Sequence, residues 1–134
     1  MKLKIPTVIF QQMVDQAKAQ IPIEACGILA GIEGRVEKFY QMTNADNSGT
    51  HFTLDPPEQF SVVKDIRAKE LEMLAVYHSH PTTPARPSQE DIRFALTPDV
   101  VYVILSLAQA DEPIVKGFNI KDSGVSEVPV EIIN

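Results

Sequence analysis

The sequence predicts an α/β fold, in which a single mixed β-sheet is flanked by about three helices. Segments whose apolar residues recur at helical spacing alternate with short apolar runs that glycine or proline bounds. The 134 residues, 44% hydrophobic and 22% charged, are sufficient for one hydrophobic core. Because no repeat, low-complexity tract or linker interrupts them, we expect one domain over residues 1–134.

The first half of the chain is expected to form a helix, a hairpin and a second helix. The first helix begins at Pro6 and Thr7 and ends near Gln20. ACGILAG (25–31) and GRVEKFYQMTNA (34–45) predict the two strands of a hairpin. NADNSGTH (44–51) predicts a loop, and HFTL (51–54) a short strand. DPPEQFSVVKDIRAKE (55–70) predicts a helix with Asp55 as N-cap and Phe60, Val63, Ile66 and Arg67 along one side.

The second half supplies most of the remaining sheet. LEMLAVYHSH (71–80) predicts a strand that ends in two histidines, and SQEDIRFALTP (88–98) a third helix that Pro98 ends. DVVYVILSLA (99–108), IVKGFNI (114–120) and VSEVPVEII (125–133) complete the sheet.

Charge and composition exclude several classes of function. The net charge is −6 and the basic residues are scattered among acids, so we expect no nucleic-acid partner. A single cysteine, Cys26, excludes an internal disulfide framework. The apolar run at the N-terminus is too short for a signal peptide and no later segment resembles a membrane span, so we expect a cytoplasmic protein without a membrane partner. The sequence does not predict an oligomeric state.

The segment YHSHPTTPARPSQED (77–91) has the pattern of a metal site. His78 and His80 point to the same face of a strand, and Pro81 ends that strand. The following prolines stiffen the path to Ser88, and Asp91 lies one turn into the next helix. Two imidazoles and one carboxylate are a typical ligand set for catalytic zinc, whose fourth ligand is water.

Each part of this pattern also has a purely structural interpretation. Two histidines on a strand are often polar residues on a solvated face. Ser88 and Asp91 fit a capping box at the start of a helix. The cap explains Ser88 and Asp91 but leaves the two histidines unexplained.

The combination of His78, His80, Pro81, Ser88 and Asp91, with Glu24 in IPIEACGILAG, resembles the JAMM motif of the JAB/MPN metalloprotease family, short prokaryotic branch. The resemblance covers nearly the whole chain, departs at no motif position, and implies the JAB/MPN fold with cytidine-deaminase-like layering. It implies that His78, His80 and Asp91 ligate one zinc ion per chain. It also implies that Glu24 is the general base and that Ser88 stabilises the oxyanion.

The resemblance further implies a zinc metallopeptidase or isopeptidase that acts on the diglycine tail of a ubiquitin-like or sulfur-carrier protein. A non-catalytic MPN-type interaction module is the alternative, although such a module needs none of the five motif residues for chemistry. Without the resemblance, Glu24 is expected to be a surface acid. Cys26 is expected to be a small buried hydrophobe rather than a thiolate ligand or nucleophile. His51 is expected in an exposed loop, with a place in a substrate groove as the alternative.

Overall fold

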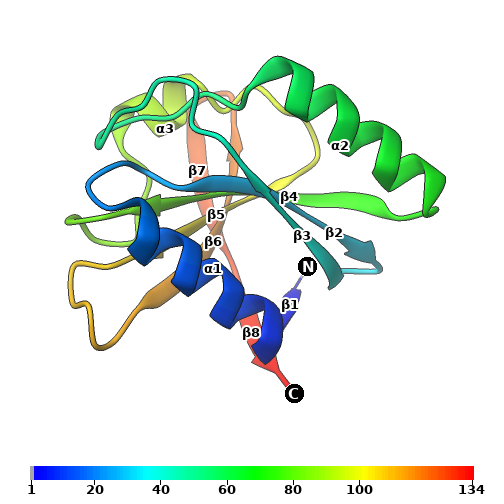
Figure 1. Ribbon diagram of the computed structural model, residues 1–134, viewed down its shortest axis with the longest axis horizontal. Coiled ribbons are helices and arrows are strands. Elements are labelled where there is room, and N and C mark those ends of the chain that lie inside the picture. The colour runs from blue at the N-terminus through cyan, green and yellow to red at the C-terminus, as the bar shows by residue number, and fades with distance from the viewer. Residues whose placement is uncertain (1) are drawn as a thin grey trace.

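The computed structural model describes residues 2–134, which form one eight-stranded mixed sheet and three helices. The strand order across the sheet is β7-β6-β5-β4-β2-β3-β1-β8. In Figure 1, α1 covers one face of the sheet, while α2 and α3 lie over the other. The predicted α/β class is therefore confirmed. The elements are β1 (Leu3–Pro6), α1 (Thr7–Gln20), β2 (Cys26–Ile32), β3 (Arg35–Met42), α2 (Pro56–Ala68), β4 (Glu72–His80), α3 (Gln89–Arg93), β5 (Val101–Ser106), β6 (Ile114–Lys121), β7 (Gly124–Val128) and β8 (Val130–Ile133).

The predicted hairpin is formed by β2 and β3. Its two-residue turn, Glu33 and Gly34, has φ of 51° and 80°, and two positive φ values are what the tightest hairpin turns require. On its other side β2 pairs antiparallel with β4, and β4 pairs parallel with β5. The end of β4 that carries the histidines therefore lies in the middle of the sheet.

Apolar side chains pack on both faces of the sheet. The apolar side chains of α1 are buried against one face: Ile9, Met13, Val14 and Ala17. The other face carries a second cluster: Cys26, Ile28, Ala30, Met42 and Ile66. Because both faces are covered, all of β5 is buried, as is β4 from Leu74 onward.

Several predicted boundaries are wrong. The sequence does not predict β1, because four residues carry too short a pattern; β1 forms by pairing parallel with β3 and with β8 from the other end of the chain. The strand predicted over HFTL is absent from the described residues, where Leu54 makes only an isolated bridge with Asn44.

The predicted helices differ from the structure mainly in α3 and in one face of α2. The third helix ends at Arg93 instead of reaching Pro98, because Phe94 and Leu96 are 59% and 79% exposed and find no buried surface to support another turn. On α2, Asp55 caps the helix and Ile66 is buried as predicted, but Phe60 is 67% exposed. No helix among the described residues has the length and apolar character needed to cross a bilayer.

Candidate active site

Two histidines at the end of β4 form the base of the site. His78 and His80 lie on one face of the sheet, only 2% and 3% exposed, and their Nε2 atoms are 3.1 Å apart. Ser79 points to the other face, where its hydroxyl accepts a hydrogen bond of 2.8 Å from the amide of Ala25. The alternation of the strand thus directs both imidazoles to one point, and the bond to Ser79 ties that end of β4 to the residue before β2.

Asp91 reaches the same point from α3. Its Oδ2 lies 3.2 Å from Nε2 of His78 and 3.0 Å from Nε2 of His80, and its side chain is 5% exposed. Four ligands placed tetrahedrally about zinc, at about 2.0–2.1 Å each, are about 3.3–3.4 Å apart. The spacing of the three atoms is close to that value, so these residues fit a metal ion.

The contacts of the imidazole rings favour metal coordination through Nε2. His80 donates its Nδ1 hydrogen to the carbonyl of Pro84 at 2.9 Å, so in the neutral ring it is Nε2 that carries the lone pair able to bind a cation. His78 stacks on Phe52, with ring centroids 4.6 Å apart and planes 22° from parallel. Nδ1 of His78 is buried and has no hydrogen-bond partner among the described residues. Apart from the contacts of its Nε2 atom with His80 and Asp91, this ring is therefore oriented by stacking.

Burial and hydrogen bonds give the ligand groups different charges. Burial opposes ionisation of Asp91, but hydrogen bonds from His78 and His80 outweigh it and hold the Asp91 pKa well below its usual range. Burial lowers the pKa of His78, which stays neutral. Burial also acts to lower the pKa of His80, but its bonds to Asp91 and Pro84 exceed that effect and raise it. The cluster thus combines an ionised carboxylate with imidazoles, the donor set of a divalent metal ion.

Glu24 lies beside this cluster and is 3% exposed, so the alternative of a surface acid is wrong. Burial raises its pKa from 4.5 to about 7, while the charge of His80 acts in the opposite direction. Its Oε1 atom is buried without a hydrogen-bond partner among residues 2–134. A carboxyl group with a pKa near neutrality can both accept and return a proton at ordinary pH.

Ser88 is the N-cap of α3, as the capping-box interpretation predicts. Its hydroxyl accepts a hydrogen bond from the amide of Asp91 at 3.0 Å, and its own amide donates to Oδ2 of Asp91 at 2.9 Å. The cap and the metal interpretations are compatible, because the cap holds the Asp91 oxygen that faces the histidines. Since the Ser88 hydroxyl is the acceptor in this pair, its O–H remains available to donate.

Cys26 lies opposite His78 in the register of β2 and β4 but belongs to an apolar cluster. It is fully buried, its sulfur donates weakly to the carbonyl of Met42 at 3.7 Å, and burial raises the pKa of the thiol to about 12. A protonated, buried thiol is not suited to act as a nucleophile or a metal ligand. This setting agrees with the prediction that Cys26 is a small buried hydrophobe.

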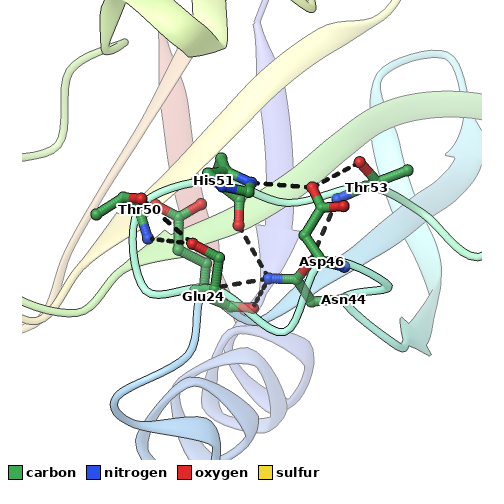
Figure 2. Close-up of polar contacts among 7 residues, drawn as sticks. Glu24, Asn44, Asp46, Thr50, His51 and Thr53 are labelled. Carbon is green, nitrogen blue, oxygen red and sulfur yellow. Dashed lines mark hydrogen bonds and ion pairs between the residues drawn. The ribbon is translucent and has the colours of Figure 1, made fainter.

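The loop between β3 and α2 forms the wall of the site that the sequence interpretation missed. His51 is partly exposed and its Nδ1 lies 2.9 Å from Oδ2 of Asp46 (Figure 2), so both the exposed-loop and the groove interpretations hold in part. A cavity of about 730 Å³ extends from His78 and Asp91 along this loop and α3. Its lining includes His51, His78 and Asp91, and its apolar lining comprises Phe52, Leu54, Val76, Phe94, Leu96, Ile104 and Ile120. The only sequence signal for this wall is the cluster of turn residues in NADNSGTH.

Comparisons with known proteins agree with this geometry. Residues 6–118 match a family model described as prokaryotic homologues of the JAB domain. The chain is 38% identical over 123 residues to the CysO-cysteine peptidase of Mycobacterium tuberculosis, covering 90% of this chain and 84% of that protein. It is 32% identical over 84 residues to the desampylase of Pyrococcus furiosus, covering 63% of this chain and 60% of that protein. The solution structure of a protein from Desulfitobacterium hafniense matches with a TM-score of 0.90 at 41% identity, covering 99% of this chain and 93% of that one.

Proposed function

The chain belongs to the family of prokaryotic homologues of the JAB domain, and from this premise we propose that it is a zinc metallopeptidase of the JAMM type. It hydrolyses the amide bond between the C-terminal diglycine tail of a ubiquitin-like or sulfur-carrier protein and the group attached to that tail. His78, His80 and Asp91 hold one zinc ion per chain, and a water molecule is the fourth ligand.

One observation carries the proposal, namely the convergence of three ligand atoms beside a buried carboxyl. The nitrogens of His78 and His80 and the oxygen of Asp91 lie within 3.0–3.2 Å of one another. Glu24 is close enough for the charges of His80 and Asp91 to affect its pKa. A protein-interaction module has no need of this arrangement, since burying four ionisable groups in a small volume costs stability.

The residues around the metal position divide the chemistry between them. Zinc, when bound, lowers the pKa of a coordinated water and polarises the scissile carbonyl. Glu24 accepts the proton that the attacking water loses and passes it to the leaving amine as the C–N bond breaks. Ser88 donates its O–H to the carbonyl oxygen while that oxygen gains negative charge. The hydroxyl of the water is added to the carbonyl carbon of the scissile amide. The other hydrogen of the water goes to the amine that leaves.

The substrate class is supported by the names of two relatives and by the cavity. The relatives are named CysO-cysteine peptidase and desampylase, and both names describe an enzyme that cleaves. The cavity that reaches the metal ligands is mostly apolar and extends along an exposed loop, so an extended peptide tail can enter it. Phe94 and Leu96 line the cavity, are largely exposed, and offer apolar surface to the body of a carrier protein.

Mass spectrometry of a defined substrate tests the proposal. The substrate is a ubiquitin-fold carrier protein whose diglycine tail is extended by one C-terminal cysteine, incubated with the zinc-loaded enzyme. We expect the wild type to release cysteine and leave the free diglycine terminus. Glu24→Gln is expected to keep its zinc and to be slower by about 10²–10⁴-fold, because the proton acceptor is lost.

The matched control is Glu72→Gln, which makes the same substitution at the exposed start of β4, the end of that strand opposite to His80. It should cleave at the rate of the wild type. A zinc-loaded wild type that leaves the carrier unchanged would point instead to the interaction module. A Glu24→Gln variant with full turnover would remove Glu24 from the proton transfer.

A further inference from the structure

Glu24 is held in place by a loop that is distant in the sequence. It precedes β2 and lies outside the strands of the sheet, so other groups must satisfy its main chain. Its amide donates to the carbonyl of Ser48 at 2.8 Å, and its carbonyl accepts from Nδ2 of Asn44 at 3.1 Å. Both contacts come from the loop between β3 and α2, drawn around Glu24 in Figure 2.

Asn44 is the centre of this loop. It is 8% exposed, and its side-chain nitrogen faces three carbonyl oxygens: Glu24 at 3.1 Å, Ser48 at 3.2 Å and His51 at 3.0 Å. Its side-chain oxygen accepts from the amides of Asp46 at 3.0 Å and Thr53 at 3.3 Å. Three acceptors on one side and two donors on the other fix which end of the carboxamide is nitrogen.

The loop that Asn44 organises also contacts the metal ligands. Phe52 stacks on His78, and His51 lines the cavity. The loop packs closely against the segment before Glu24, because a Cβ atom at Gly49 would lie 2.5 Å from the carbonyl oxygen of Pro22. One buried carboxamide therefore connects the backbone of Glu24 to the segment that carries the ring stacked on a metal ligand.

We infer that Asn44 is a positioning residue of this enzyme, which holds Glu24 at a fixed place relative to the metal ligands. The inference rests on the proposed function, in which Glu24 accepts the proton. Only a carboxamide serves here, because it supplies two N–H donors and a carbonyl acceptor on a short side chain. Aspartate would present an anion to three carbonyl oxygens, and alanine would leave all five backbone partners without a bond to residue 44.

A purely structural role for Asn44 makes a different prediction. If it only closes the loop, its loss lowers stability and leaves the turnover of the folded enzyme unchanged. If it positions Glu24, its loss lowers kcat in the folded, metal-loaded enzyme. The affinity for metal should change less than kcat, because His80 is oriented by Pro84 and Asp91 by Ser88, both outside the loop. Only His78, which stacks on Phe52, depends on the loop for its orientation.

The experiment compares Asn44→Ala with the wild type on the cysteine-extended carrier protein. We expect kcat to fall by about 10- to 100-fold, as for a displacement of about 1 Å in a reacting group. KM should stay within about threefold of the wild type. The Kd for Co²⁺, followed by the visible spectrum of the bound ion, should rise by a clearly smaller factor than the fall in kcat, because two of the three ligands are oriented from outside the loop. Asn119→Ala, at an exposed position on β6, is the control for the loss of a carboxamide and should match the wild type.

A second variant and a double mutant make the test decisive. Asn44→Ser, whose hydroxyl keeps one donor, is measured by the same criteria if Asn44→Ala does not fold. On the Glu24→Gln background, Asn44→Ala should cause no further loss, because the residue through which it acts is already disabled.

Three outcomes would overturn the inference. The first is a folded Asn44 variant with wild-type kcat, and the second is a fall in kcat matched by an equal loss of Co²⁺ affinity. The third is an additive loss in the double mutant. A zinc-loaded wild type that does not cleave the carrier would refute the proposed function and this role together, whereas a cleaving wild type with an unaffected variant refutes only the role of Asn44.

Discussion

The raised pKa of Glu24 predicts that Glu24→Gln stabilises the metal-free protein at alkaline pH. Burial raises this pKa from 4.5 to about 7, so between these values the native state holds a proton that the unfolded chain has lost. Unfolding releases that proton, and the free energy of unfolding therefore falls as the pH rises through this window. Glutamine cannot ionise, so the variant lacks this loss.

The magnitude follows from the width of the window. Each pH unit between the two pKa values is worth about 1.4 kcal/mol, so the wild type loses about 3 kcal/mol by the time the pH exceeds 7. Glu24 is 3% exposed, so solvent does little to reduce this effect. We expect the variant to be more stable than the wild type by about 3 kcal/mol at pH 8 and by less than about 1 kcal/mol at pH 5.

Urea denaturation of the two metal-free proteins at pH 5, 6, 7 and 8 measures this difference. His78, His80 and Asp91 titrate in both proteins, so comparing the variant with the wild type at each pH largely removes their contribution. A stability difference that does not change between pH 5 and 8 would refute the reasoning. A wild type that becomes the more stable protein as the pH rises would reverse the assigned direction of the pKa shift.

Three other substitutions test the site. His80→Ala should contain no zinc by metal analysis, because only two of the three protein ligands remain, and a chelator should therefore cause no fall in its Tm. Unchanged zinc content would remove His80 from the ligand set. Cys26→Ser should keep zinc and turnover while losing about 1–3 kcal/mol of unfolding free energy, because a hydroxyl is buried among apolar side chains; a folded but inactive variant would give the thiol a chemical role. Phe52→Leu should weaken metal binding by about 10-fold in competition with a chromophoric chelator, because the stack that orients His78 is lost, and unchanged affinity would contradict that contribution.

The three proposed metal ligands are the part of the site that the sequence predicts most directly, because their arrangement is local. Alternation along one strand puts His78 and His80 on the same face, and a capping box places Asp91 one turn into α3. These rules act within fifteen residues. Glu24 differs, because its burial depends on a loop about twenty residues further along the chain. The residues alone predict that Glu24 is a surface acid, and only the family resemblance singles it out as the expected general base.

The features that sequence reasoning missed all depend on contacts between distant segments. The strand β1 forms only because β8, from the other end of the chain, pairs with it. Asn44 and Phe52 lie in a segment whose composition predicts a loop, and no local pattern shows that one is buried or that the other stacks on His78. A rule of local periodicity cannot find such residues, because their environment is set by tertiary contacts.

The charges of the site link the base to the metal. Near neutral pH and without a cation, Glu24 is substantially protonated, because burial opposes its ionisation more strongly than His80 favours it. A divalent cation at the point where His78, His80 and Asp91 converge would favour the ionised form, so in the proposed mechanism metal loading would make Glu24 a base. Because burial disfavours the ionised carboxylate, it also favours any conformation that exposes the Glu24 side chain to water. The two main-chain bonds that tie it to Ser48 and Asn44 oppose that movement. In the proposed mechanism, these two bonds would keep a carboxyl that is costly to bury close to His78, His80 and Asp91, where it would transfer the proton.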